Sequence, residues 1–312
     1  MNDVFDCRDA FVEALCDVAA ADDRVVVVVN DSVGSSKLGP FAQRFPERLV
    51  NVGIAEQTMV GVAAGLAASG LVPFVSGAAC FVTARATEQL KVDVAYSRRN
   101  VKICGQSPGM GYGELGPTHH SIEDLSWLRA MPGLAIIVPS DRVETAAAIR
   151  WMAAFEGPVY IRISRLPVPA VFGDDYEFTP GKGRVVRPGD DVTIIANGVL
   201  LNRALAAADQ LGAKGIGARV VSMPSVAPLD EDLILTCASE TGGLVTLEEA
   251  LVSGGLGAGV ASIVAQHHPV PMRILGVQDA LAPTGSESWL LDHFGMAVPD
   301  IVSAATELTG RR

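Results

Sequence analysis

Two stretches of the sequence hold residue types that could carry out acid–base chemistry. In NVGIAEQ, a predicted strand and a glycine turn lead into a helix that places Glu56 in its first turn. A carboxylate there either pairs with the free backbone N–H groups of the helix start or acts as an acid toward a bound ligand. In GELGPTHH, His119 follows a Gly-Pro-Thr turn in a long loop, and imidazole is the side chain that exchanges protons near neutral pH.

Runs of apolar residues predict the elements that position these side chains. Five consecutive valines, Val25–Val29, have the length and character of a strand covered by helices on both faces. Such runs alternate with helical patterns, one of them over 84–96, which predicts an α/β fold with two doubly wound, mainly parallel sheets. Residues 1–170 form the first predicted domain, 171–190 a linker rich in proline and glycine, and 191–312 the second domain.

Composition limits the partners and the compartment. The formal net charge of −11 argues against nucleic acid or an anionic membrane as a partner. The five cysteines are scattered without a CxxC pair, which is typical of reduced thiols in a cytoplasmic enzyme. The uncharged stretch 60–82 is interrupted by Ser69, Gly70 and Pro73, so it predicts buried elements and no membrane span. The acidic N-terminus predicts no signal peptide.

The motifs VGIAEQ and GELGPTHH, with a helix of small residues after the first, together resemble the transketolase family of thiamine diphosphate enzymes. The resemblance implies that residues 1–170 form a pyrimidine-binding domain and residues 191–312 a transketolase C-terminal-like domain. In that family a glutamate of this motif hydrogen-bonds the aminopyrimidine ring of the cofactor and so promotes loss of the proton from C2 of its thiazolium ring. Glu56 is the residue that matches.

The resemblance covers nearly the whole chain but only part of the family's enzyme. The Gly-Asp-Gly motif with which the diphosphate-binding domain holds its metal does not occur in the sequence. The resemblance therefore implies a split transketolase, in which an N-terminal diphosphate-binding subunit holds Mg²⁺ or Ca²⁺ and the chains self-associate as an α2β2 heterotetramer. A zinc site at His119, His120 and Glu123 is a weak alternative, because adjacent histidines point apart and no further ligand lies at the usual spacing. We expect no metal ligands in this chain.

Further positions match the family by motif or by spacing. Phe81, in AACFVTARATEQ, matches an aromatic side chain that packs on the aminopyrimidine ring, and a core phenylalanine is an equal alternative. His119 matches a histidine that contacts the hydroxyls of the donor sugar and assists proton transfer. An aspartate near the cofactor is matched by Asp31. The positions that match residues binding the substrate phosphate, each with a surface salt bridge or turn as the alternative, are Arg8, Ser35 and Arg165.

Three positions depart from the family's pattern. Leu115 stands where transketolases usually carry an aspartate that accepts a hydrogen bond from a donor hydroxyl, and a leucine cannot accept it. Ser107 stands where many carry a histidine near the phosphate, and Ala78 replaces a second aromatic side chain of the cofactor pocket. These departures leave the residues that activate the cofactor in place and favour a modified or otherwise unusual ketose donor.

The sequence thus predicts a transferase subunit that moves a two-carbon ketol unit from a ketose, as a sugar phosphate or a modified sugar, to an aldose acceptor. The alternatives are the β-subunit of a 2-oxoacid dehydrogenase's decarboxylating component, a deoxyxylulose phosphate synthase-like half-enzyme, and a non-catalytic scaffold subunit. GPTHH and the pair Ser164–Arg165 favour transketolase over the first, and Leu115 with the SRLP segment counts against the second. The joint presence of Glu56 and His119 argues against the third.

Overall fold

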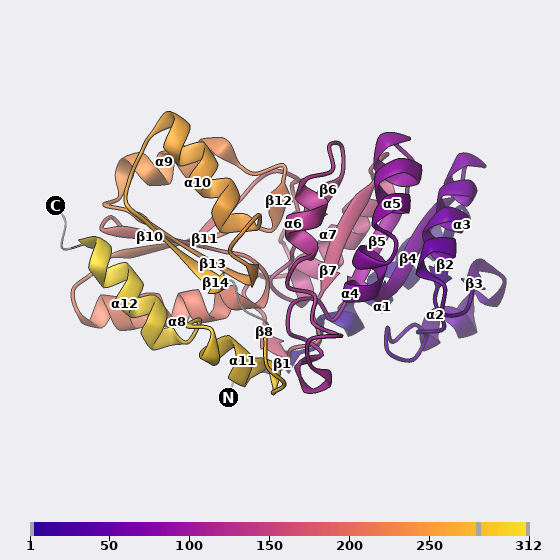
Figure 1. Cartoon of the computed structure of the whole chain (residues 1–312), viewed down its shortest axis with the longest axis horizontal. Coiled ribbons are helices and arrows are strands. Elements are labelled where there is room, and N and C mark those ends of the chain that lie inside the picture. The colour runs from indigo at the N-terminus through magenta and orange to yellow at the C-terminus, as the bar shows by residue number, and fades with distance from the viewer. Residues whose placement is uncertain (1–2, 279–281, 310–312) are drawn as a thin grey trace.

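The computed structural model describes residues 3–278 and 282–309, which form two α/β units side by side (Figure 1). Each unit has a central sheet with helices on both faces, and the predicted fold class with two mainly parallel sheets is confirmed. The valine run forms strand β2 (Val25–Val29), in which every side chain is buried, because helices cover both faces of the sheet.

In the described chain the first sheet has the strand order β12-β6-β7-β5-β4-β2-β3 and is parallel except at its β12 edge. Apart from β2, its strands are β3 (Leu49–Asn51), β4 (Val72–Ala78), β5 (Lys102–Gln106), β6 (Ala135–Ile137), β7 (Val159–Ile163) and β12 (Ser225–Ala227). One apolar cluster fills the face under α1 (Cys7–Ala21), α2 (Gly39–Arg44) and α7 (Arg142–Ala154). A second fills the face under α3 (Glu56–Ala68), α4 (Ala79–Ala84) and α6 (Asp124–Arg129).

The second sheet has the order β14-β13-β10-β11-β9 and is parallel except for β9. Its strands are β9 (Arg184–Arg187), β10 (Val192–Ala196), β11 (Ala218–Ser222), β13 (Leu244–Leu251) and β14 (Met272–Val277). One face packs against α8 (Leu201–Ala213), α11 (Glu287–His293) and α12 (Val298–Thr309), and the other against α9 (Glu231–Glu240) and α10 (Leu256–His267).

The helix predicted over 84–96 is wrong in its start and its continuity. α4 begins at Ala79 and is followed by α5 (Thr87–Gln89) and a π-helical segment, η2 (Leu90–Tyr96). Thr83 Oγ1 donates to the carbonyl of Ala79 at 2.7 Å, and Thr87 Oγ1 donates to the carbonyl of Thr83 at 2.6 Å. Threonine hydroxyls that bond back one turn in this way bend helices, which accounts for the broken segment.

The segment predicted as a linker contains regular structure. Strand β9 falls within residues 171–190 and pairs with β11 of the second sheet, so this part of the segment belongs to the second unit. Just before the segment, β8 (Val168–Pro169) pairs antiparallel with β1 (Val4–Phe5) and ties the end of the first unit to its beginning. The prediction missed this four-residue strand because the segment is rich in proline and glycine. The strand lies at the edge of the sheet, where it pairs on one side only.

Each of the two units contributes residues to the sheet or the core of the other. Strand β12 follows β11 in the sequence, yet it pairs antiparallel with β6 and forms the edge of the first sheet. In the opposite direction, Met110 and Ile122 of the first unit are buried in the core of the second. The second unit therefore completes the first sheet and anchors one of its loops.

A buried charge network strengthens this connection. Arg162, on β7, pairs with Asp124, and its Nε lies 3.0 Å from Asp124 Oδ2. Its Nη1 donates to the carbonyl of Glu249 at 2.9 Å, across to the second unit. The Tyr160 hydroxyl donates to the same Asp124 carboxylate. Since Arg162 and Asp124 are almost inaccessible to solvent, each charge depends on the other for compensation.

In the described chain, no helix combines the length and the apolar character that crossing a membrane requires. The stretch 60–82 instead supplies the buried parts of α3, β4 and α4, as the sequence predicts. All five cysteines are free and buried, so no disulfide joins them.

Candidate functional site

Glu56 is the first residue of α3, at the carboxyl end of the parallel strands of the first sheet. The chain leaves β3 and turns at Gly53, whose φ of 73° favours glycine. The residue before the helix, Ala55, gives no side-chain cap, so the first turn relies on Glu56 itself. Ligands of open parallel sheets bind at this end, which favours the catalytic interpretation of the carboxylate over the purely structural one.

Two side chains hold the Glu56 carboxylate in place. The amide of Asn30 donates to Glu56 Oε1 at 2.8 Å, and Arg85 Nη1 donates to the same oxygen at 3.0 Å. The glutamate side chain is only 4% exposed. Burial raises the pKa of Glu56, but its backbone N–H, Asn30 and Arg85 together lower it further, so the pKa lies below its usual value. The carboxyl group is therefore ionised at neutral pH in this arrangement.

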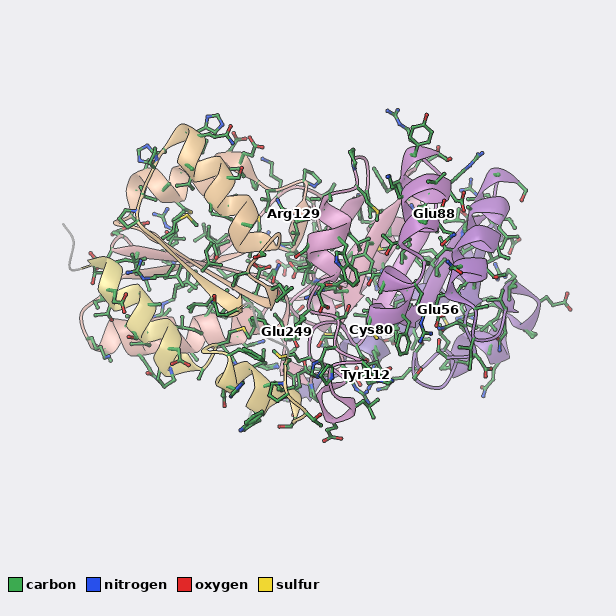
Figure 2. The ribbon with its side chains drawn as sticks, viewed as in Figure 1. Glu56, Cys80, Glu88, Tyr112, Arg129 and Glu249 are labelled. Carbon is green, nitrogen blue, oxygen red and sulfur yellow. The ribbon has the colours of Figure 1, made fainter. Side chains whose placement is uncertain are left out.

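Phe81 and His119 meet next to this carboxylate, although they are far apart in sequence. Their ring centroids lie 5.1 Å apart with an edge-to-face orientation, and Tyr112 lies on the other side of His119 with its centroid at 6.0 Å. Thr118 Oγ1 lies 2.9 Å from His119 Nδ1 and so fixes one ring nitrogen. Figure 2 shows Glu56 and Tyr112 on the same side of the first unit.

The loop that carries His119 is held at both ends. Gly109 and Ser121 exchange backbone hydrogen bonds of 3.0 and 2.7 Å, which close the base of the loop. Met110 N donates to Glu249 Oε1 of the second unit at 2.6 Å. Long glycine-rich loops are ordinarily mobile, and these contacts give this one a fixed position over the sheet.

One cavity of about 360 Å³ brings most of the predicted site together. The predicted residues that line it are Asp31, Ser35, Glu56, Phe81, Leu115 and His119. The other lining residues are Asn30, Ser32, Ile54, Ala78, Arg85 and Tyr112. The wall thus combines a buried carboxylate, aromatic faces and an imidazole with few charged groups, which suits an aromatic heterocycle next to a polar substrate.

Asp31 and Ser35 lie on the loop after β2. Asp31 takes φ 66°, and the Asn51 amide donates to Asp31 Oδ1 at 3.1 Å, which ties this turn to the one before α3. Arg8 lies next to this loop, since its Nη1 donates to the carbonyl of Ser35 at 3.1 Å. Arg8 also forms a 2.6 Å ion pair with Asp6, so part of its charge is already compensated.

Arg165 and Ser107 lie outside the main cavity. The guanidinium of Arg165 stacks over Tyr112, 4.9 Å from the ring centroid, and lines a neighbouring cavity of about 390 Å³ together with Leu115. Leu115 and Tyr112 therefore separate the two cavities. Ser107 is fully buried and lines neither cavity, and its hydroxyl has no hydrogen-bond partner among the described residues. Its role in substrate binding stays a prediction.

Asn30, Arg85 and Tyr112 are among the cavity residues that sequence reasoning missed. The sequence contains a pattern that could have indicated two of them. Asn30 directly follows a buried strand, where polar side chains reach the ligand end of the sheet, and Arg85 lies four residues after Phe81, the spacing at which helical neighbours touch. Tyr112 lies in an irregular loop whose fold no local pattern determines.

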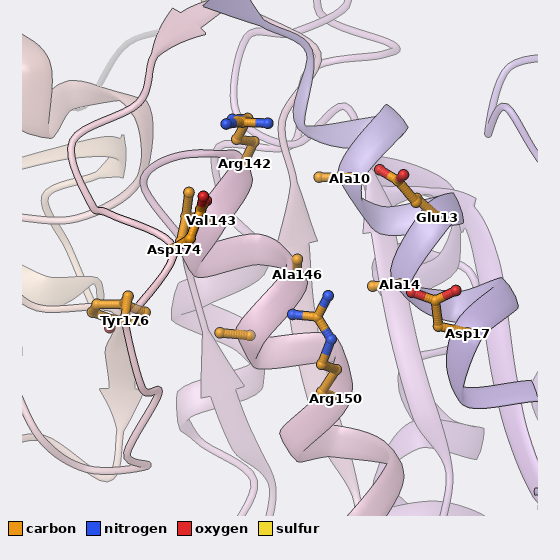
Figure 3. A pocket seen from close by; sticks show the side chains of 11 residues that line it. Ala10, Glu13, Ala14, Asp17, Arg142, Val143, Ala146, Arg150, Asp174 and Tyr176 are labelled. Atoms are coloured by element: carbon orange, nitrogen blue, oxygen red, sulfur yellow. The ribbon is translucent and has the colours of Figure 1, made fainter. Parts of the chain in front are cut away.

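A cavity with charged walls lies apart from this site. This cavity of about 340 Å³ between α1 and α7, shown in Figure 3, is lined by charged residues such as Glu13, Asp17, Arg142 and Arg150 but by none of the predicted site residues. No group of three or more His, Cys, Asp or Glu side chains within the described residues could hold a metal ion. His120 is buried, and burial lowers its pKa, whereas His119 faces the cavity.

The residues present fit the aminopyrimidine part of thiamine diphosphate. Such a ring needs a carboxylate at its edge and an apolar face to pack on, and Glu56 and Phe81 supply both from one wall. Nothing on that wall offers the carboxylate cluster that a diphosphate-bound Mg²⁺ requires. The cavity therefore fits one half of the cofactor.

Comparison with known proteins gives consistent matches over the whole chain. The family model for the transketolase pyrimidine-binding domain matches residues 3–170, and that for the transketolase C-terminal domain matches residues 181–301. An apulose-4-phosphate transketolase subunit of Phocaeicola vulgatus is 43% identical over 98% of both chains. The 6-deoxy-6-sulfo-D-fructose transketolase subunit SqwH of a Clostridium species is 41% identical over 98% of this chain and 95% of its own. A solved split-gene transketolase, described as an inactive β4 tetramer, superposes with a TM-score of 0.90 at 39% identity over 99% of both chains.

Proposed function

The chain belongs to the transketolase family, as one subunit of a split transferase, and we propose that its main cavity is the pyrimidine half of a thiamine diphosphate site. Membership of the family implies dependence on thiamine diphosphate. The observation that carries the proposal is the meeting of Glu56, Phe81 and His119 around one cavity. The alternative functions have less support, because the family models and these relatives are transketolases.

Glu56 and Phe81 are proposed to hold the aminopyrimidine ring. Phe81 supplies an apolar face, and Glu56 places a carboxylate at the ring edge, where it can share a proton with a ring nitrogen. The cofactor, when bound, supplies the carbanion chemistry of ketol transfer. Asn30 orients the Glu56 carboxylate through the 2.8 Å hydrogen bond to Oε1.

His119 is proposed to exchange protons with the hydroxyl groups of the sugar. Because Nδ1 lies 2.9 Å from the Thr118 hydroxyl, Nε2 is the ring nitrogen left for the substrate. For a phosphate, Arg165 is the stronger proposed contact, since its guanidinium is held over Tyr112 at the side of the cavity. Arg8 and Ser35 contribute less in this proposal, because Arg8 already pairs with Asp6.

A second, diphosphate-binding subunit is proposed to close the cavity and hold Mg²⁺. Ile54 and Leu115 line the cavity and are 78% and 57% exposed, so apolar side chains stand in solvent around its mouth. A partner that covered them would bury this surface. The likeness to a tetrameric split-gene enzyme supports self-association, and an α2β2 assembly is the arrangement that we propose.

Native mass spectrometry in the presence of thiamine diphosphate and Mg²⁺ tests this proposal. The chain should retain the cofactor only when it is mixed with its diphosphate-binding partner, because neither chain alone completes the site. The chain alone and the partner alone are the controls. Tight cofactor binding by this chain alone, or the absence of any mixed complex, would contradict the shared site.

The donor is proposed to be a ketose whose hydroxyl groups differ from those of the usual donor at the position next to Leu115. That side chain lines both cavities and offers no hydrogen-bond acceptor. Two relatives carry the names of unusual ketoses, apulose 4-phosphate and 6-deoxy-6-sulfo-D-fructose, which supports an unusual donor here.

Leu115→Asp should raise kcat/KM for an ordinary pentose ketose phosphate by about tenfold relative to the unchanged enzyme, the value of one hydrogen bond to a hydroxyl. Initial rates with the complete two-subunit enzyme measure this effect. Leu115→Ala is the matched control, since it removes the leucine without adding an acceptor. Equal rates for the Asp and Ala variants would show that this position does not read a donor hydroxyl.

A further inference from the structure

Arg85 makes two contacts on the cavity wall that belong together. It lies just past the end of α4, and its guanidinium carbon lies 4.1 Å from the centroid of the Phe81 ring. Its Nη1 also donates a 3.0 Å hydrogen bond to Glu56 Oε1. The arginine therefore engages both an aromatic face and a buried carboxylate at once.

In the proposed function, the aminopyrimidine ring makes the same two contacts, one with the face of Phe81 and one with the Glu56 carboxylate. A guanidinium group is planar, packs face-on against aromatic rings and presents N–H donors at its edge. An aminopyrimidine ring is also planar and meets a carboxylate with its edge. The face of Phe81 that Arg85 covers cannot pack against the ring at the same time, whereas the Glu56 carboxylate has lone pairs for more than one donor.

We propose that Arg85 holds the place of the aminopyrimidine ring while the cofactor is absent, and that the ring displaces it on binding. This inference rests on the proposed function of the cavity. Arg85 is thus an internal competitor that sets the affinity for the cofactor.

The surroundings of Arg85 allow this displacement. Its side chain is 50% exposed, so water can solvate the guanidinium when it moves away, and the Glu56 carboxylate, which is 4% exposed, keeps its hydrogen bond from Asn30. A further cavity of about 420 Å³ lies at the start of α3, lined by Ile54, Ala55, Gln57 and Thr58. Glu56 and Arg85 line this cavity as well as the main one, so Arg85 stands between them and has space on its far side.

Displacement also changes the electrostatic surroundings of Glu56. Burial raises its pKa, and the backbone N–H, Asn30 and Arg85 lower it. Loss of Arg85 removes one of the groups that favour the anion, so the pKa rises. The other titratable groups that line the cavity are Asp31, Tyr112 and His119.

Isothermal titration of thiamine diphosphate, with Mg²⁺, into the complex of this chain with its diphosphate-binding partner tests the inference. Arg85→Ala should bind the cofactor about three- to tenfold more tightly than the unchanged complex, since the half-exposed guanidinium no longer competes for the Phe81 face.

The matched control is Arg24→Ala, which removes another half-exposed arginine from an ion pair, with Asp22, away from the cavity. It should leave the affinity unchanged. Arg85→Lys keeps the positive charge but lacks the planar guanidinium group, and its affinity should fall between that of the unchanged complex and that of Arg85→Ala. Weaker or equal binding by Arg85→Ala overturns the inference. If the unchanged complex binds no cofactor, the proposed function fails and the inference fails with it.

Discussion

Glu56→Gln, assembled with its diphosphate-binding partner, should lose ketol transfer by roughly two to four orders of magnitude, the range that a positioned acid–base group contributes. The amide has the shape of the carboxyl group but cannot exchange a proton with the aminopyrimidine ring. The hydrogen bond from Asn30 to Oε1 can persist in the variant, so we expect the fold around α3 to be kept. Steady-state kcat at saturating cofactor and donor measures the loss.

Glu88→Gln is the matched control. Glu88 is an exposed glutamate of the same unit, on α5 beyond the cavity (Figure 2). It should retain the rate of the unchanged enzyme. Equal, high activity of both variants would show that Glu56 is only a helix-start carboxylate, and the scaffold alternative would then have to be reconsidered.

Asp124→Asn should lower the free energy of unfolding by about 3–5 kcal/mol, the cost of leaving one member of a buried ion pair without its partner. The amide matches the carboxylate in size, so the loss does not come from a cavity. It comes from Arg162, which is 2% exposed and would keep a buried charge without compensation. Urea unfolding followed by circular dichroism and extrapolated to water measures the change.

Asp22→Asn provides the comparison for this prediction. Asp22 pairs with Arg24 at 2.8 Å on the surface, where both side chains are accessible to water. Its loss should cost about 0–1 kcal/mol, because solvent already screens such pairs. Similar losses for the two variants would mean that the buried Asp124–Arg162 pair stabilises the fold no more than a surface pair does.

The core of the site could be predicted from the sequence because its residues follow strong local patterns. The strand–glycine–helix order places Glu56 at the ligand end of the sheet, and the Gly-Pro-Thr turn places His119 in a long loop. The structure brings both residues, with Phe81, Asp31, Ser35 and Leu115, to one cavity. The β–α alternation likewise determined the two parallel sheets, since each buried strand requires an apolar run of its own length.

The parts of the site and of the fold that the sequence did not predict depend on contacts between residues that are distant in the chain. Asn30 and Arg85 meet Glu56 only after β2, α3 and α4 are packed together. Strand β12 has three residues and pairs across the two units, so no local periodicity could show it. The position of Arg165 beside the neighbouring cavity of about 390 Å³ likewise follows from the path of the loop around Tyr112.

The exchange of strand β12 has a consequence for how the chain is made. A ribosome delivers residues 1–170 well before Ser225–Ala227, so the nascent first sheet carries an unpaired edge at β6 while the second unit is still being synthesised. Glu249, which fixes the loop at Met110, arrives later still. The half that holds the proposed catalytic residues is thus finished only after much of the second unit has been made, and a chain that stalls in between exposes an open strand to its neighbours on the polysome.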